Sequence, residues 1–270
     1  MNDLLTPISL GSTGLTTSRL GLSTSYWPGK KTVYRAIDEG INFFFGFGFD
    51  LQLVGALRTA MRGKREKFIL ATGAYNYILG YPNLRRTLEK RLRQFSTDYI
   101  DVFLFLGVMK EKEFPQRALE ELVRLREEGK VRAIGMSCHD RTYVGKMASQ
   151  GSLDVMMMRY NAAHRGAESD IFPYLARHNP GIMSYTATRW TALLRRPKGW
   201  PKEGRIPDPG MCYRFVLSNP SVHVCLTGPM NEKQLVQNVG ALKLGPLNAE
   251  DMQFMQQFGD AVHNQHKWFM

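Results

Sequence analysis

Short runs rich in β-branched and aromatic residues alternate with longer helical patterns along this chain of 270 residues. Alternation of this kind is typical of parallel strands that are joined by crossover helices. Eight of the short runs have the length of strands, and they are Ser18–Ser23, Asn42–Phe47, Lys67–Thr72, Ile100–Leu106, Ala133–Ser137, Leu153–Met158, Gly181–Thr186 and Val222–Thr227. The chain is therefore expected to form an α/β fold with one parallel sheet.

Each predicted strand is followed by a stretch with helical character, and a ninth helix is expected near the end. These stretches are Lys31–Glu39, Leu51–Met61, Asn83–Gln94, Pro115–Glu128, Arg141–Ser149, Ser169–Arg177, Pro209–Ser218, Glu232–Ala241 and Ala249–Ala261. Eight strands that are each followed by a helix close into a (β/α)8 TIM barrel. Ile8–Gly21 carries glycines suited to a tight turn, which predicts an N-terminal β-hairpin. No linker divides the chain, so residues 1–270 are expected to form a single domain.

The formal net charge of +12 favours anionic partners, of which nucleic acid is the first to consider. The densest basic stretch holds Arg85, Arg86, Lys90, Arg91 and Arg93. These residues alternate with leucines at helical spacing, which is typical of the solvated outer face of an amphipathic helix. The chain has no basic tail and no basic ribbon interleaved with aromatic residues, as single-strand binders have. We therefore expect no nucleic-acid partner.

Cysteine usage and hydropathy bear on metals, disulfides and membranes. Cys138, Cys212 and Cys225 lie far apart with no CxxC spacing, so buried thiols are expected, and neither a disulfide framework nor a metal site. No stretch approaches about twenty consecutive apolar residues, and the first residues lack the pattern of a secretory signal. A cytoplasmic protein without a membrane partner is expected, and its oligomeric state is left open.

Three segments resemble the aldo-keto reductases, and with the order of strands and helices they extend the likeness over nearly the whole chain. The opening hairpin and first strand of that family are similar to Leu10–Leu15 and Ser18–Leu22. The most specific match is the middle signature, which follows Thr97–Val102, Ala118–Leu122 and Gly129–Ser137. The third is the loop Thr227–Asn231, which looks like the segment that holds the adenosine end of a nicotinamide cofactor. The resemblance implies a barrel with its active site at the carboxyl ends of the strands.

The resemblance also implies a catalytic tetrad, in which a Tyr donates a proton with help from an Asp, a Lys and a His. In this sequence the Asp position is Phe45, the Lys position is Gly73 and the His position is Leu106. The stretch that should carry the Tyr ends in Phe49 and Asp50 and contains no Tyr. Deleting one partner of a buried ion pair leaves a stranded charge, whereas replacing both by apolar residues is nearly neutral. The four changes therefore indicate coordinated loss, with the Phe45 ring expected in the volume of the absent Lys stem.

The resemblance assigns five cofactor-binding residues to this sequence: Ser137, Tyr185, Gly228, Gln234 and Asn238. The amides at positions 234 and 238 have the helical spacing needed to reach one adenine edge. On the nicotinamide side, however, the family's Asn is Cys138 and its Gln is Met157. Whether NAD or NADP binds, and which of the two, stays open at this point.

Strand alternation nominates other residues for the barrel mouth, because successive side chains point inward and outward. The candidates for catalysis are Asp50, Tyr75, His139 and Arg159, with Arg189 brought to the mouth by the same parity. An inward Arg needs a partner, which is either a carboxylate or phosphate ligand or an internal ion pair to Asp50 or Asp140. The aromatic run from Phe43 to Phe49 predicts an apolar wall, which suits either core packing or a flat ligand.

Three functions fit these observations. The first is a barrel of this family type that does not reduce carbonyls through the tetrad. Such a barrel binds a nucleotide or another small-molecule ligand, anionic or aromatic, or it is redeployed for non-redox chemistry. The second is an NAD- or NADP-dependent oxidoreductase with a displaced proton donor, such as His139 or a relocated Tyr. The third is an interaction protein that uses its basic surface.

Overall fold

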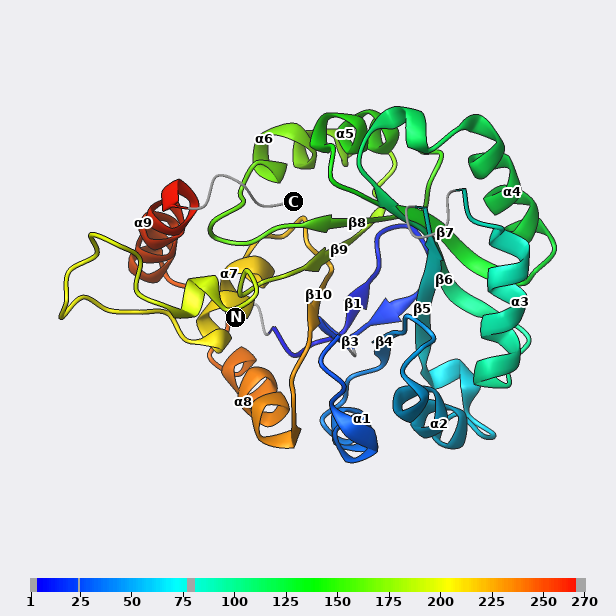
Figure 1. Ribbon diagram of the computed structural model, residues 1–270, viewed down its shortest axis with the longest axis horizontal. Helices are drawn as coiled ribbons and strands as arrows, with labels where there is room; N and C mark the ends of the chain where they lie inside the picture. The colour runs from blue at the N-terminus through cyan, green and yellow to red at the C-terminus, as the bar shows by residue number, and fades with distance from the viewer. Residues whose placement is uncertain (1–3, 24, 77–80, 266–270) are drawn as a thin grey trace.

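Eight parallel strands close into a barrel in the computed structural model of the protein, which describes residues 4–23, 25–76 and 81–265 (Figure 1). The ring runs β10-β3-β4-β5-β6-β7-β8-β9, with every neighbouring pair parallel. The strands are β3 (Leu20–Ser23), β4 (Phe43–Phe45), β5 (Ile69–Tyr75), β6 (Ile100–Val108), β7 (Val131–Cys138), β8 (Val155–Arg159), β9 (Gly181–Tyr185) and β10 (Val224–Thr227). All eight predicted strands are confirmed.

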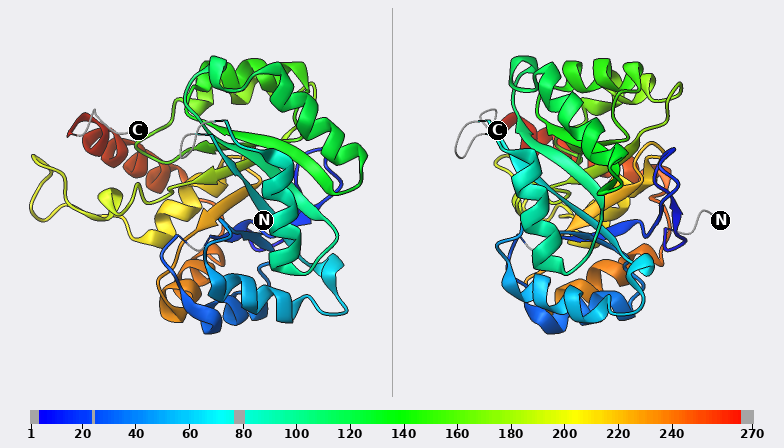
Figure 2. Two further views of the ribbon diagram at one scale, coloured as in Figure 1. Left: turned by 45° about the vertical axis from the view of Figure 1, so that its right-hand side comes forward. Right: turned by 90° about the vertical axis from the view of Figure 1, so that its right-hand side faces the viewer.

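Helices cover the outside of this barrel, as Figure 1 and the two turned views of Figure 2 show. They are α1 (Gly29–Asp38), α2 (Leu51–Ala60), α3 (Leu84–Phe95), α4 (Gln116–Glu127), α5 (Arg141–Gln150), α6 (Ala167–Asp170), α7 (Pro209–Ser218), α8 (Glu232–Leu242) and α9 (Ala249–Gln265). Five of them begin at an Asp or Asn whose carboxylate or amide oxygen accepts a backbone N–H of the first turn: Asp50, Asn83, Asp140, Asp208 and Asn231. The TIM-barrel fold expected from the sequence is confirmed.

A small antiparallel hairpin closes the amino-terminal end of the barrel (Figure 2). Its strands are β1 (Ile8–Ser9) and β2 (Thr16–Thr17), as predicted. Leu10 and Leu15, on either side of its turn, pack into the interior of the barrel. A Cβ built on Gly11 would clash with the backbone around Asn179, so only glycine allows the hairpin to lie this close.

The apolar core has two parts, and strand alternation separates them. One part lies between the strands and the surrounding helices. The other fills the inside of the barrel with side chains such as Phe43, Phe45, Val102, Leu104 and Val155. Alternate residues of each strand point inward. The inner set therefore shows which of the later residues of each strand also point into the barrel near its mouth.

A buried ion network lies at the amino-terminal ends of β5 and β6. The carboxylate of Asp101 is fully buried, and its Oδ2 accepts hydrogen bonds from Arg65 Nη2 at 2.6 Å and Leu70 N at 2.9 Å. Its Oδ1 accepts from Arg132 Nη1 at 3.0 Å. The Arg65 guanidinium also donates to Thr97 Oγ1 and to the Tyr99 carbonyl. The middle signature of the sequence thus ties the 3₁₀ turn η1 (Arg65–Lys67) and strands β5, β6 and β7 together.

Two expectations from the sequence are wrong in detail. The helix expected over Ser169–Arg177 is instead the short α6 followed by a single 3₁₀ turn, η3 (Phe172–Tyr174). Pro173 explains this, since it has no N–H to donate and its ring would clash with the preceding helical turn. Arg91 is not solvated on the outer face of α3. Its guanidinium lies beneath Gly48 and donates to Gln94, and burial lowers its pKa.

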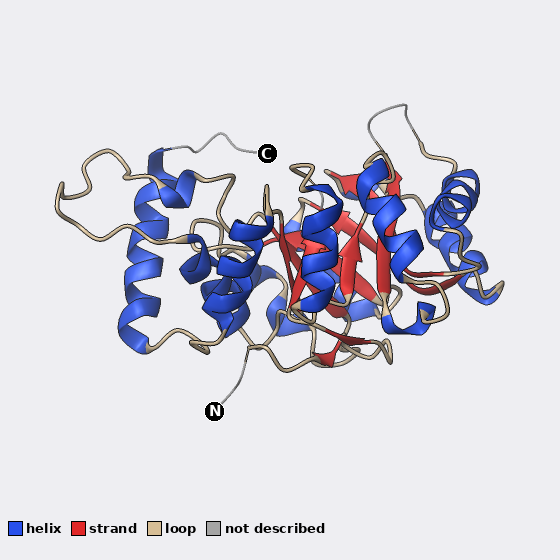
Figure 3. Cartoon of the chain, turned by 90° about the horizontal axis from the view of Figure 1, so that it is seen from below, coloured by secondary structure: helices blue, strands red, loops and turns tan. Residues whose placement is uncertain are grey.

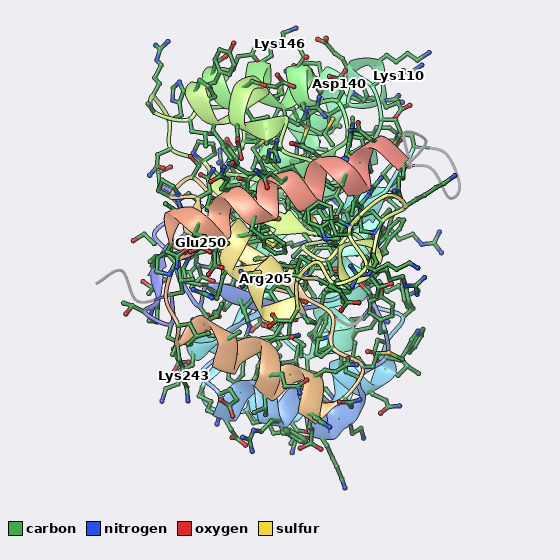
Figure 4. All side chains as sticks on the ribbon, turned by 90° about the vertical axis from the view of Figure 1, so that its left-hand side faces the viewer. Lys110, Asp140, Lys146, Arg205, Lys243 and Glu250 are labelled. Carbon is green, nitrogen blue, oxygen red and sulfur yellow. The ribbon has the colours of Figure 1, made fainter. Side chains whose placement is uncertain are left out.

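Helix α9 extends beyond the barrel together with the loop between the 3₁₀ turn η4 (Ala192–Leu194) and α7 (Figure 3). Figure 4 shows α9 crossing one side of the molecule, with Glu250 in its first turn and Arg205 nearby. Arg205 forms an ion pair with Asp251 at 2.7 Å, which fastens the loop to the helix. The three cysteines are buried thiols, as predicted.

Candidate ligand-binding site at the barrel mouth

Three positions of the expected tetrad, those of the Asp, the Lys and the His, lie on the inner face of the barrel near its carboxyl-terminal mouth. The stretch that should carry the Tyr ends outside it, because Phe49 is 57% exposed and Asp50 caps α2. Phe45 and Leu106 belong to the apolar set inside the barrel, and both are buried. Phe45 pairs with Ala71 in the neighbouring strand, so Gly73 is the next inward position of β5. The described interior at this depth therefore holds hydrocarbon side chains where the family resemblance implies an Asp, a Lys and a His.

Gly73 has no room for a side chain. A Cβ built there would lie 2.8 Å from Cγ and 2.9 Å from Cδ1 of Leu106, and closer still to the carbonyl oxygen of Leu104. The three atoms nearest to that Cβ belong to Leu104 and Leu106, so Leu106, which stands at the His position, closes the space directly above Gly73. That the Phe45 ring fills the volume of the missing Lys stem stays a prediction.

A ladder of aromatic rings leads outward from this apolar floor on one side of the mouth. Phe45 meets Phe47 edge to face at 5.1 Å between ring centroids, and Phe47 stacks on Phe49 at 5.3 Å and on Tyr75 at 5.9 Å. Phe49 in turn lies 5.8 Å from Trp27, and both outer rings are 57% exposed. We call Trp27, Phe47, Phe49 and Tyr75 the aromatic ladder. It confirms the apolar wall expected from the sequence.

A cluster of cationic and imidazole side chains lies on the other side of the mouth. Arg159 ends β8 and pairs with Tyr185 at the last rung between β8 and β9. The ring of Tyr185 lies 6.3 Å from the ring of His139, which follows β7. In the ring order β4 is diametrically opposite β8, and β5 is opposite β9. The aromatic ladder and this cationic cluster therefore face each other across the mouth.

Two imidazoles of this cluster, those of His139 and His164, are held in the neutral form. Burial, and then the charge of Arg159, lower the pKa of His139, whose Nδ1 is buried without a hydrogen-bond partner among the described residues. The same causes, with smaller contributions from Arg189, His263 and Arg141, lower the pKa of His164 to about 3. Its buried Nε2 also has no partner in the described part of the chain. The cluster thus combines guanidinium charge with imidazole nitrogens that a ligand can use.

The mouth arginines form no ion pair with Asp50 or Asp140, the two partners expected from the sequence. Asp50 and Asp140 are the N-caps of α2 and α5, and their Oδ1 atoms accept backbone N–H groups there. Arg189 is 2% exposed and donates from Nη1 to the carbonyl of Val262 in α9 at 2.7 Å. This cation thereby stabilises the carboxyl end of a helix. Asp50 Oδ2 is buried without a hydrogen-bond partner among the described residues.

Backbone strain is concentrated at the mouth. Among the described residues, seven other than glycine have positive φ, and five of them follow β3 or β9: Trp27, Thr186, Arg189, Trp190 and Thr191. Such conformations cost of order 1–3 kcal/mol each and tend to gather at functional sites. The loop after β9 and the outermost ring of the aromatic ladder are therefore held in shape by their surroundings.

The residues assigned to a cofactor divide into two groups. On the nicotinamide side, Ser137 pairs with Met157 between β7 and β8, and its hydroxyl oxygen accepts the Gly107 N–H at 2.9 Å. Cys138 Sγ faces the Asp140 carbonyl at 3.6 Å, and burial raises its pKa to about 12. Neither Met157 nor Cys138 offers the amide that the family resemblance implies. Of the four nicotinamide contacts that the resemblance implies, the Asn and the Gln are therefore replaced, whereas Ser137 and Tyr185 are present.

On the adenosine side, the two amides point differently. Gln234 Oε1 accepts the Met230 N–H at 2.8 Å at the surface. Asn238 is buried and donates from Nδ2 to Thr227 Oγ1 at 3.0 Å. The ring of Tyr26 lies over Gly228, within 3.1 Å of where a Cβ would stand. A shared contact of both amides with one adenine edge stays a prediction.

The structure thus brings together His139, Arg159 and Tyr185, and separately joins Tyr75 to the aromatic ladder. Asp50 is set apart from the cationic cluster by its role in capping α2. His164 is the residue of the mouth that the sequence did not single out. Its ring is placed by a backbone bridge with Asn161, and no residue pattern signals that contact.

Comparisons with known proteins agree with this geometry. The model of the aldo/keto reductase family matches residues 7–202. The aldo-keto reductase YhdN of Bacillus subtilis is 28% identical over 62% of this chain and 57% of its own length. The NADH-specific methylglyoxal reductase of Escherichia coli is 24% identical over 94% of this chain and 98% of its own.

Solved structures show the same fold. The holo form of the aldo-keto reductase AKR11C1 from Bacillus halodurans superposes with a TM-score of 0.79 at 20% identity, covering 98% of this chain and all of that one. An aldo/keto reductase of Klebsiella pneumoniae in complex with NADP and acetate superposes with a TM-score of 0.72 at 22% identity, covering 91% of this chain and 92% of that one.

Within the described ranges, no three His, Cys, Asp or Glu side chains gather where they would hold a metal ion. None of the helices seen in those ranges combines the length and the apolar character needed to span a bilayer.

Proposed function

Since the chain belongs to the aldo/keto reductase family, we propose that its barrel mouth binds a small organic anion with a flat apolar part, and that it does not reduce carbonyls through the family's tetrad. One observation carries the proposal: the aromatic ladder after β4 and β5 faces Arg159 and His139 after β8 and β7. A flat apolar group stacks on exposed rings, whereas a carboxylate or phosphate pairs with a guanidinium.

The apolar floor supports the second half of the proposal. General acid catalysis by a phenol requires neighbours that lower its pKa toward the working pH. Gly73 and Leu106 supply no charge, and the packing around Gly73 leaves no space for a Lys. Tyr75 stacks on Phe47 in the aromatic ladder. Such stacking does not lower the pKa of the Tyr75 phenol, whereas rings arranged in this way can stack on flat molecules. The chain's residues accordingly bind and orient a ligand.

A second candidate is an NAD- or NADP-dependent oxidoreductase with a displaced proton donor. Its support is the placement of Ser137 and Tyr185, which lie on the inner face next to Met157 and Arg159, and the reductase activities named for relatives. A bound nicotinamide would supply hydride. His139, neutral because burial and Arg159 lower its pKa, would then have to relay a proton from water.

The proposal is tested by titrating the protein with 1-naphthoate and following Trp fluorescence, because Trp27 ends the ladder. Saturable quenching is expected, with 1-naphthol binding more weakly since it lacks the carboxylate. Arg159→Gln should weaken naphthoate binding by about tenfold or more, the value of a charge-assisted hydrogen bond. Arg93→Gln on the outer face of α3 is the matched control and should bind as the wild type does.

Turnover is measured separately with methylglyoxal and NADH or NADPH, by the absorbance of the reduced cofactor. Naphthoate binding without turnover supports the proposal. Turnover at the rate of an ordinary reductase overturns it in favour of the second candidate. Equal binding of naphthoate to wild type and Arg159→Gln contradicts the anion-binding role of the cationic cluster.

A further inference from the structure

A basic cavity lies at the opposite end of the barrel from the mouth. It has a volume of about 480 Å³ and is lined by Arg58, Met61, Arg62, Gly63, Arg65 and Ser96. These residues belong to the end of α2, the turn before β5, and the cap that follows α3. The cavity therefore sits near the amino-terminal ends of β5 and β6, and we call it the basal pocket.

One wall of the basal pocket is rigid. The Arg65 guanidinium donates to the Phe68 carbonyl at 2.7 Å as well as to Thr97, Tyr99 and Asp101, and it stacks on the Tyr99 ring at 4.1 Å. These contacts fix its plane before any ligand arrives. Ser96 has a left-handed backbone at φ 52°, which holds its exposed hydroxyl group at the rim.

The other two arginines of the pocket are differently placed. Arg58 and Arg62 are exposed, and neither forms an ion pair with a carboxylate of the described residues. No Asp or Glu lines the cavity. The one carboxylate bound to its wall, Asp101, is already shared between Arg65 and Arg132. Two exposed guanidinium groups, those of Arg58 and Arg62, therefore face a cavity whose wall is held by Arg65, which is itself paired with Asp101.

The surrounding sequence strengthens this charge. Residues 30–95 contain thirteen Lys and Arg but only five Asp and Glu, so this quarter of the chain carries about two thirds of the net charge of +12. Part of the basic character has a structural reason, because Arg58 lies in the last turn of α2, where a cation complements the helix dipole. Arg62 and Arg65 lie beyond that helix and have no such role.

We propose that the basal pocket binds the phosphate group of a small phosphorylated molecule. Guanidinium groups match a phosphate through paired N–H donors, and a hydroxyl such as that of Ser96 adds a further donor. The volume exceeds the need of phosphate alone, so a phosphomonoester fits the cavity better than the free ion. This site is independent of the barrel mouth, and its failure would leave the proposed function untouched.

The test titrates the full chain with adenosine monophosphate, inorganic phosphate and acetate in a calorimeter. One site per chain is expected, with the monophosphate ester tighter than phosphate and acetate weakest. Arg58→Gln combined with Arg62→Gln should weaken binding of the ester by about tenfold or more. Arg86→Gln combined with Lys90→Gln removes two exposed cations from the outer face of α3 instead. Neither residue lines the pocket, and salt screens charges at a distance, so the affinity should change by less than about twofold.

Equal losses in the two double variants would overturn the proposal, since they would indicate general attraction to a basic surface. Absence of ester binding to the wild type would also overturn it. Both double variants alter exposed side chains, and an unchanged midpoint of unfolding establishes that each is folded. Ser96→Ala gives a third readout, for which a smaller loss of ester affinity supports the site and no change argues against the hydroxyl contact.

Discussion

Cγ of Leu106 lies 2.8 Å from the point where a Cβ at Gly73 would stand, so the two residues share one volume of the barrel interior. Gly73→Ala should therefore lower the free energy of unfolding by about 1–3 kcal/mol, the usual cost of overpacking. Leu106→Ala should also destabilise, by about 2–5 kcal/mol, because it opens a cavity. The double variant is expected to lose less than the sum of the two losses, as measured by denaturant unfolding.

Gly240→Ala is the control for this experiment. Gly240 lies in α8, and a Cβ there would meet nothing within 4 Å. This substitution should be neutral or stabilise the protein by up to about 1 kcal/mol, since Ala favours helices. Strict additivity of Gly73→Ala and Leu106→Ala would contradict the shared volume.

The buried carboxylate of Asp101 should be the most sensitive charge in the fold. Asp101→Ala leaves Arg65 without its anionic partner in a largely buried place, and we expect a loss of about 3–5 kcal/mol in the free energy of unfolding. Glu111→Gln breaks the exposed pair with Lys146 and should cost less than about 1 kcal/mol. Denaturant unfolding of both variants compares the two environments, and similar losses would contradict the role of the buried network.

The barrel followed from the sequence because each strand and helix carries its own periodicity, and eight such units have one common closed arrangement. The break between α6 and η3 was missed although Pro173 marks it, since the apolar spacing around it favoured a continuous helix. Arg91 was assigned to the solvent from its place in a basic stretch. Its burial beneath Gly48 depends on the loop after β4, and helical spacing carries no information about that loop.

The candidate site, like the fold, was predicted from the sequence only in part. Alternation along β8 and β9 placed Arg159 and Tyr185 inward, and the aromatic run around Phe45 predicted the apolar wall. The contact of Leu106 with the space directly above Gly73 was not predicted, because the rotation of a side chain between neighbouring strands is set by packing. The pairing of Arg189 with a helix carbonyl also depends on where α9 lies, and no short-range pattern encodes that position.

His223 should make stability depend on pH. Burial, and then Arg19, lower its pKa to about 4, and its Nδ1 accepts the Ile182 N–H at 3.0 Å. Below a pH of about 6.5 the unfolded chain gains a proton at this residue that the folded chain does not bind. The free energy of unfolding should therefore fall as pH drops from about 6.5 to about 4, by at most about 3 kcal/mol from this residue, with no such effect above that range.

His223→Asn keeps an acceptor but cannot titrate, so its loss of stability between pH 7 and pH 4 should be smaller than that of the wild type. The matched control is His178→Asn, which removes an imidazole whose ring forms no hydrogen bond in the described part of the chain. Thermal or denaturant unfolding across this pH range measures the difference. The same pH profile for wild type and His223→Asn would refute the assignment.

Asp50 can be tested as a helix cap and as a catalytic candidate at once. Asn caps helices as well as Asp does, so Asp50→Asn should leave the free energy of unfolding nearly unchanged, whereas Asp50→Ala should lower it by about 0.5–2 kcal/mol. If the residue only caps α2, Asp50→Asn also retains naphthoate binding at the mouth. Loss of ligand binding or turnover in Asp50→Asn without loss of stability would instead assign it a role in the chemistry.

The shared volume of Gly73 and Leu106 also bears on how reversible this mouth is in evolution. A Lys at position 73 has no space unless Leu106 becomes smaller and the Leu104 carbonyl shifts, while a His at position 106 would put a polar ring among hydrocarbon side chains. If the chain lacks the family's tetrad, as proposed above, each single substitution toward it is expected to pass through a less stable intermediate. Selection that acts on one substitution at a time would therefore tend to keep apolar residues at these positions of the barrel.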